Sequence, residues 1–208
     1  MTRRDSVSFV ISLTLVAAAC GKDDKTAASS GGDKAAAGHS TAQSIDPAAA
    51  NALVPEELKG KLEFEKREIQ LERGDETTYT FAAPKGWKVE GIFGTLKPES
   101  DMGFFTEMRV GSDCGGRCEK KNWEEVANKS FFDRLTQAKV HKDEKGKSSR
   151  LVIADTDEAG IQRTEIVYAW WSEGAEHYHH CTVKLHDEAK PAVAAFEKAC
   201  QAVLVSED

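Results

Sequence analysis

The sequence lacks two features that large classes of protein require, a surplus of basic residues and a long apolar run beyond its start. Its 35 acidic residues outnumber 28 Lys and Arg residues, which gives a formal net charge of −7 at pH 7. Nucleic-acid binding needs a clustered basic face, so we expect no nucleic-acid partner. After residue 20, no uninterrupted apolar run approaches the roughly eighteen residues of a membrane span. We therefore expect no membrane-spanning helix in that part of the chain.

Recognised catalytic motifs are also missing. The sequence contains no Gly-x-Ser-x-Gly elbow, no His-Glu-x-x-His pair, no phosphate loop ending in Gly-Lys-Ser/Thr and no dinucleotide fingerprint. We expect a protein that is not an enzyme and that needs no cofactor. Because catalytic groups also assemble from distant positions, an unrecognised hydrolase stays open as an alternative.

The first twenty residues have the pattern of an export signal. Arg3 and Arg4 give a positive start, and residues 7–19 form a mostly apolar stretch that ends in three alanines before Cys20. The run Ala-Ala-Ala-Cys resembles the lipobox of bacterial lipoproteins. This resemblance implies that residues 1–19 are a signal peptide and that Cys20 carries a covalent lipid. The alternative is an ordinary signal peptide whose removal leaves a free soluble protein.

The resemblance to lipoproteins also implies a location. Asp directly after the lipidated cysteine tends to retain such proteins at the inner membrane, and this chain has Gly21 there. We therefore expect a lipid-anchored protein of the bacterial cell envelope, at the outer membrane in preference to the inner membrane. Residues 20–50 contain almost no large apolar side chain, which predicts a disordered tether. Residues 51–208 are then the single globular domain.

The domain has the pattern of an α+β fold. Predicted strands cover residues 62–71, 76–81, 87–93, 102–110, 150–154, 161–171 and 177–185. One helix is predicted over residues 122–138, where Asn122 and Glu125 have capping-box spacing, and another from Pro191 to about Leu204. Helices dispersed among hairpin-like strands favour an antiparallel sheet with two main helices packed on it.

The Pro84-Lys85-Gly86-Trp87 cluster and the order of the elements after it resemble PsbP-like domains. The resemblance covers roughly residues 62–205. It implies an α/β/α sandwich, with an accessory or binding role in place of catalysis.

Four cysteines remain when Cys20 is set aside, an even number that predicts disulfides in an exported protein. Of three connectivities we favour Cys114–Cys118, which encloses two glycines, and Cys181–Cys200, which joins apolar faces of a strand and a helix. A redox or metal site is the alternative for the first pair. Its Cys-x3-Cys spacing with distant histidines is similar to the copper site of Sco-like chaperones, although that family has a thioredoxin-type fold.

Three histidines surround Tyr178. On a strand His177 and His179 share one face while His180 lies on the other. We predict that His179 is a partly buried sheet residue and His177 a rim residue, with no metal bound. A periplasmic copper or zinc carrier is the alternative function. Its candidate ligands are Cys114, Cys118, His177 and His179, with His186 as a further imidazole.

Trp170 and Trp171 project to opposite faces of a predicted strand. One of them belongs in the core, and the other is a candidate anchor for an envelope protein or a small ligand. Ordinary sheet packing is the alternative for both. The leading hypothesis is thus a membrane-anchored accessory or binding domain without catalysis.

Overall fold

The computed structural model describes six stretches of the chain. They are residues 45–71, 77–91, 94–99, 106–114, 118–172 and 177–207. The predicted signal peptide, Cys20 and the linker up to residue 44 lie outside the described residues, as does the turn predicted at Arg73-Gly74-Asp75. None of the helices in the described stretches has the length and apolar character needed to cross a membrane.

The fold is α+β and its strands are antiparallel, as predicted, but they form two sheets instead of one. The smaller sheet has the order β1-β2-β10, with β1 at Phe64–Leu71, β2 at Thr77–Pro84 and β10 at Leu204–Glu207. The larger sheet has the order β3-β4-β5-β9-β8-β7-β6. Its strands are β3 (Lys88–Glu90), β4 (Thr95–Lys97), β5 (Glu107–Asp113), β6 (Lys139–Lys145), β7 (Ser149–Glu158), β8 (Ile161–Trp171) and β9 (Tyr178–His186).

The helical segments are short except at two places. The elements are α1 (Pro47–Asn51), η1 (Glu56–Leu58), α2 (Trp123–Ala127), η2 (Asn128–Phe132), α3 (Asp133–Thr136), η3 (Asp187–Ala192) and α4 (Val193–Gln201). The first main helix is the continuous run α2–η2–α3, in which η2 is a π-helical turn. The second is α4.

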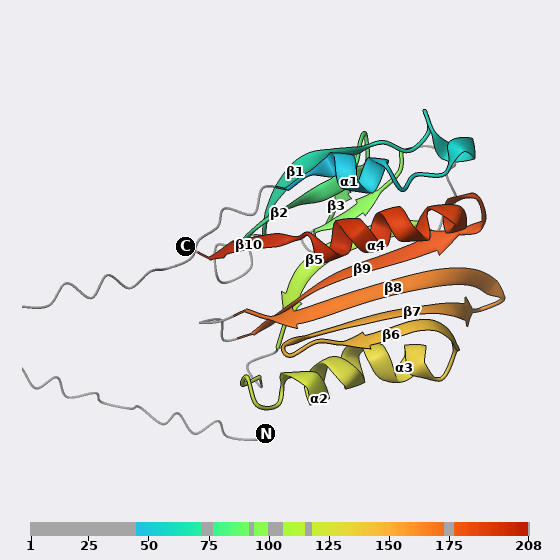
Figure 1. Cartoon of the computed structure of the whole chain (residues 1–208). Helices are drawn as coiled ribbons and strands as arrows, with labels where there is room; N and C mark the ends of the chain where they lie inside the picture. Colours follow the sequence, from blue (N-terminus) through green and yellow to red (C-terminus); the bar gives the residue numbers. More distant parts are fainter. Residues whose placement is uncertain are drawn as a thin grey trace, which may run out of the picture. The chain divides into compact units, whose positions relative to one another are not determined.

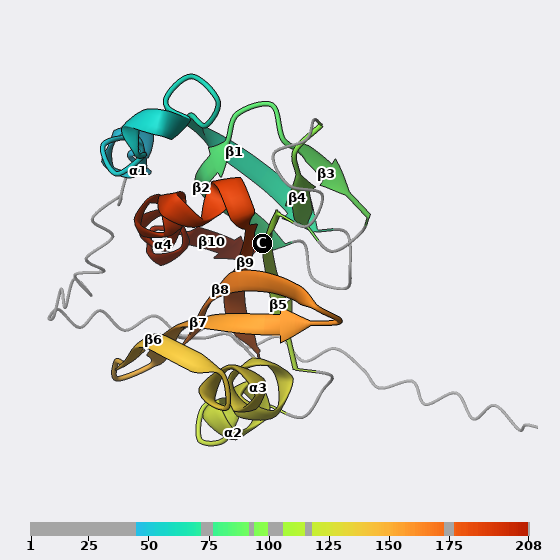
Figure 2. The same cartoon turned by 90° about the vertical axis from the view of Figure 1, so that its right-hand side faces the viewer.

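The two main helices cover opposite faces of the seven-stranded sheet (Figures 1 and 2). The α2–α3 run lies against β6, β7 and β8, while α4 lies on the other face between this sheet and the smaller one. Each face of the larger sheet therefore has its own hydrophobic core.

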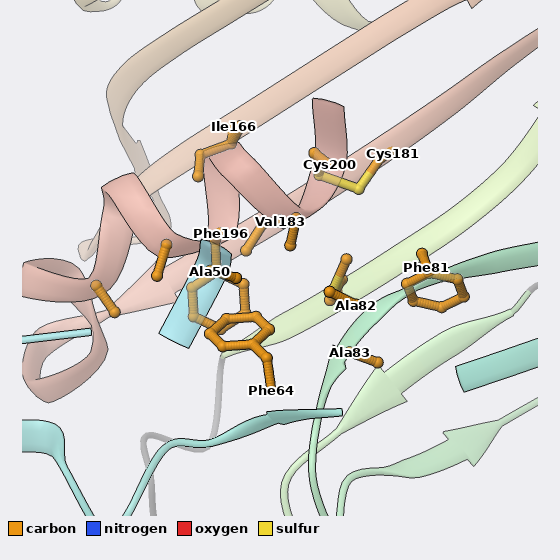
Figure 3. Packing of buried hydrophobic residues seen from close by; sticks show 14 of the residues in the cluster. Ala50, Phe64, Phe81, Ala82, Ala83, Ile166, Cys181, Val183, Phe196 and Cys200 are labelled. Atoms are coloured by element: carbon orange, nitrogen blue, oxygen red, sulfur yellow. A yellow bond between two sulfur atoms is a disulfide. The ribbon is translucent and has the colours of Figure 1, made fainter. Parts of the chain in front are cut away.

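The larger core joins α1, α4 and the small sheet to one face of the large sheet. Phe196 of α4 contacts Phe64 of β1 edge-on, with ring centroids 5.1 Å apart (Figure 3). The smaller core lies under α2–α3 and contains Trp123, Leu135 and Trp171. Burial of these aromatic and aliphatic side chains is the main stabilising contribution to the fold.

The folded part begins before residue 51, the predicted start of the domain. Asp46 caps α1 by accepting a hydrogen bond from the Ala48 amide at 2.9 Å, and Ala50 is buried in the larger core. The Asn51 side chain then binds both the amide and the carbonyl of Phe64, at 2.7 and 2.8 Å. The Asn51 side-chain amide therefore pairs with the backbone of β1 as a neighbouring strand would. This contact fixes α1 on the sheet.

The Pro84-Gly86-Trp87 cluster forms the turn at the end of β2. Gly86 has a φ of +77°, a conformation that a side chain disfavours. The turn returns the Trp87 ring to the core, where its centroid lies 5.8 Å from that of Phe196. The cluster therefore has a packing role in this fold.

Three details of the predicted elements are wrong. The last helix ends at Gln201, and Leu204 belongs to strand β10, which pairs with β2. Strands β4 and β6 were not predicted at all. Asn122 does not cap α2 with its side chain, which accepts a hydrogen bond from the Glu119 amide at 2.6 Å.

Candidate functional site

The cysteines of the domain form the two favoured disulfides. Cys114 pairs with Cys118, with Cα atoms 5.2 Å apart, at the end of β5. Cys181 of β9 pairs with Cys200 of α4, with Cα atoms 5.4 Å apart (Figure 3). The second bond fixes the helix on the sheet at the centre of the larger core.

The candidate metal ligands are not brought together as free ligands. The sulfurs of Cys114 and Cys118 are bonded to each other, so a thiolate ligand would require prior reduction. Across the described stretches, no three His, Cys, Asp or Glu side chains are grouped closely enough to hold a metal ion.

His179 and His177 share a face, as the strand pattern predicts, and their ring centroids lie 5.0 Å apart. His179 is completely buried, deeper than the partial burial we predicted. Its Nδ1 lies 2.9 Å from the hydroxyl oxygen of Tyr79, which belongs to the other sheet. Burial and the nearby His177 lower the pKa of His179 to about 4, so the ring is neutral at pH 7.

His180 lies on the opposite face of β9 and is also completely buried. Its ring packs against Phe131, with centroids 4.8 Å apart, and faces Gly111 of the adjacent strand. Neither ring nitrogen has a hydrogen-bond partner among the described residues. Burial, with the charge of Arg109 and the neighbouring His179, lowers the pKa of His180 to about 3. Two neutral imidazoles thus flank the centre of the large sheet.

Trp170 and Trp171 point to opposite faces of β8, as predicted. Trp171 belongs to the smaller core and is 8% exposed. Trp170 is half-buried at the margin of the larger core, and its ring stacks on Tyr168, with centroids 5.2 Å and planes 22° apart. The Trp170 ring also lies beside the His179 ring, with centroids 5.6 Å apart. Of the two, Trp170 is therefore the candidate binding residue.

A hollow lies beside this aromatic stack. It has a volume of about 530 Å³, within the range of small-molecule sites. Its lining residues are Glu144, Lys145, Gly146, Ser149, Leu151, Tyr168 and Gln201. We call it the Tyr168 hollow. The β6–β7 hairpin and the C-terminal turn of α4 supply its walls, and Tyr168 with Leu151 supplies its apolar part.

The rim of the Tyr168 hollow is held by a network of ion pairs. The Lys142 ammonium lies 2.7 Å from Glu197 of α4 and 3.1 Å from Glu144 of the same strand. The Gln201 side-chain amide lies 3.4 Å from the same Glu197 carboxylate. Hydrogen bonds that Lys142 donates to Glu197 and Glu144 raise the pKa of Lys142, so it stays charged. The network connects β6 to α4 next to the hollow.

The buried carboxylate of Glu165, on β8, has a structural role. Glu165 is 2% exposed, and both of its oxygens accept hydrogen bonds from the Arg134 guanidinium, at 2.8 and 2.6 Å. The Thr156 hydroxyl donates a third, at 2.6 Å. Burial alone would raise the pKa of Glu165, but these hydrogen bonds outweigh it and the pKa lies below its ordinary value. This pair fixes α3 on the sheet.

Tyr168, Ser149 and Gln201 were not predicted from the sequence as residues of a common hollow. They lie on three different elements, and only the fold brings them to one hollow. The one signal available was Tyr168 itself, which is two positions before Trp170 and therefore on the same strand face.

The sequence shows no relationship to known protein families or to curated proteins. No model of a known protein family matches the chain, and no curated protein is similar to it in sequence. The geometry of the domain is therefore the basis on which its function is proposed.

Proposed function

We propose that this chain is an exported lipoprotein whose folded domain binds a partner or small ligand at the Tyr168 hollow and the adjoining Trp170 ring. One observation supports the binding role above others. The half-buried Tyr168 ring lines a hollow whose other side chains, apart from Leu151, are charged or polar, and it stacks on the half-buried Trp170 ring. Aromatic side chains with a few placed polar groups are typical of ligand sites.

Several of the chemically versatile side chains elsewhere in the described part have structural roles, which favours binding over catalysis. Glu165 is engaged by Arg134, and the four domain cysteines are in disulfides. His179 is buried with its Nδ1 on Tyr79. We therefore favour an accessory or binding role, in the sense that the PsbP-like resemblance implies.

The membrane anchor in this proposal is an acyl group on Cys20, and Gly21 directs the protein to the outer membrane of the cell envelope. The intact mass of protein extracted from membranes tests this. We expect a chain that begins at Cys20, carries lipid and contains two disulfides. Cys20→Ser is the control and should be found with its leader attached or in the soluble fraction. An unmodified natural protein free in solution would contradict the anchor.

Photo-crosslinking in living cells tests the binding surface. A photoreactive amino acid replaces Tyr168 in one variant and Phe131 in another, because both rings are half-buried but lie on opposite faces of the sheet. We expect adducts, read by intact mass, from position 168 and not from position 131. Equal labelling at both positions, or none at 168, would count against the proposed site.

A further inference from the structure

The apolar part of the Tyr168 hollow is formed by side chains of two neighbouring strands. Tyr168 of β8 is the register partner of Leu151 of β7, and the next residue on the same face of β8, Trp170, is the partner of Ser149. The Tyr168 ring is half-buried and stacks on the Trp170 ring. The floor therefore presents an aromatic surface to which a ligand with a flat apolar face can pack.

The charged groups of the rim are of both signs. Glu144 and Lys145 both line the hollow, and Lys142 forms ion pairs with Glu144 and Glu197 at 3.1 and 2.7 Å. Lys145 lies 4.0 Å from a carboxylate oxygen of Glu124. Because no single sign dominates, a phosphate or other strongly charged ligand gains little from this rim.

The uncharged polar groups have a mixed hydrogen-bonding character. Ser149 contributes a hydroxyl, which donates and accepts, and Gln201 contributes an amide with both donors and an acceptor. Ligand hydroxyl groups also donate and accept, so they match such a lining. A hydroxyl-rich ligand can therefore be bound at its edge while its apolar face rests on Tyr168.

We propose that the Tyr168 hollow binds a neutral sugar ring, either free or as one unit of a longer glycan. A pyranose has the two surfaces that the hollow complements, a face of C–H groups for the aromatic floor and an edge of hydroxyls for Ser149 and Gln201. This inference rests on the binding role proposed above and gives it a ligand class.

The test uses Trp170 as an internal reporter. The chain has four tryptophans, and Trp87, Trp123 and Trp171 are 4%, 4% and 8% exposed, so Trp170 is the half-buried one. The purified full chain is titrated with chitotetraose, with maltotetraose and with the non-fluorescent ring cyclohexanol while tryptophan emission is recorded. We expect saturable changes with at least one sugar. Binding of cyclohexanol alone, or of none of the three together with no retention on insoluble chitin, would overturn the proposal.

Variants test whether the change in tryptophan emission comes from binding at the Tyr168 hollow. Tyr168→Ala should weaken sugar binding by about tenfold or more, because aromatic anchors dominate small sites. Gln201→Ala alters an exposed side chain, should leave the fold intact, and should weaken binding several-fold. Phe131→Leu, on the opposite face, is the matched control and should bind as the parent does. Unchanged affinity in both hollow variants would overturn the proposal.

Two further results separate the outcomes. Retention of the chain on insoluble chitin without binding of free chitotetraose indicates a unit within a long glycan, whereas solution binding indicates a free sugar as well. If position 168 crosslinks in cells but no sugar binds, the ligand class is wrong while the binding site stands. If neither is observed, both proposals fail.

Discussion

The hydroxyl oxygen of Tyr79 lies 2.9 Å from Nδ1 of His179, and this hydrogen bond joins the small sheet to the large one inside the core. Both side chains are completely buried. The ring centroid of Trp170 lies 5.6 Å from that of His179. The inter-sheet contact therefore borders the aromatic part of the proposed site.

We expect the protein to lose stability when the pH falls below about 6.5. The pKa values of His179 and His180 are about 4 and about 3 in the folded state, below the ordinary histidine value, so the unfolded chain binds protons first. The contribution of these two histidines to the unfolding free energy is fully present above pH 6.5. It is lost as the pH falls toward their folded-state pKa values. At pH 5 each histidine should reduce the unfolding free energy by about 2 kcal/mol. Urea unfolding from pH 8 to pH 5 measures this.

The control for the pH effect is a double variant, His179→Gln with His180→Gln, which removes both ionisations. Its stability should vary much less over the same pH range. The same pH dependence in this variant and the parent would contradict the assignment.

Tyr79→Phe should destabilise the protein by about 1–3 kcal/mol, because Nδ1 of His179 loses its buried hydrogen-bond partner. Replacing both residues, Tyr79→Phe with His179→Phe, removes the unsatisfied nitrogen as well. The double variant should then lose less than the sum of the single variants. Simple additivity in chemical denaturation would show that the two side chains are not coupled.

Removal of the two disulfides should have unequal effects. Cys181 and Cys200 are 19 positions apart and Cys114 and Cys118 only 4, so the first bond restricts the unfolded chain more. In the loop-entropy model the losses are about 3 and about 2 kcal/mol. Paired Cys→Ala variants of each bond, compared by urea denaturation, test the order. A larger loss from Cys114→Ala with Cys118→Ala would contradict it.

Arg134→Met should cost about 2–3 kcal/mol, because it leaves the buried carboxylate of Glu165 without its main donor while the arginine itself is partly exposed. Arg134→Met combined with Glu165→Leu should recover part of this loss. Lys129→Met is the matched control, since its pair with Glu125 on the same helical run is exposed and should not alter stability measurably. Thermal unfolding of the three variants gives the comparison.

The sequence predicts best those features that depend on neighbouring residues. The α+β class, most strands and the two disulfides follow from apolar alternation and from cysteines on apolar faces. Strand β6 was missed because it is an edge strand, Lys-Val-His-Lys-Asp-Glu-Lys, whose mostly exposed charged side chains do not alternate with apolar ones. Strand β10 was missed because Val203 and Leu204 continue the helical spacing of α4.

The site was less predictable because it depends on the three-dimensional arrangement. Gln201 approaches Tyr168 only when α4 lies on the sheet. The Tyr79–His179 contact joins residues 100 positions apart. Local patterns contain no information about such encounters, whereas the opposite orientations of Trp170 and Trp171 follow directly from strand geometry.

The place of β10 in the small sheet has a consequence for how the chain matures. Leu204 pairs with Thr80 of β2, so the third strand of this sheet is supplied by a segment synthesised long after the other two. A chain interrupted near residue 200 would present β2 with one side unpaired, together with a Cys181 whose partner is absent or newly emerged. Completion of the small sheet and oxidation of Cys181 with Cys200 therefore both wait for the stretch from Cys200 to β10. Until that stretch has been synthesised, the nascent domain is exposed to chaperones and proteases.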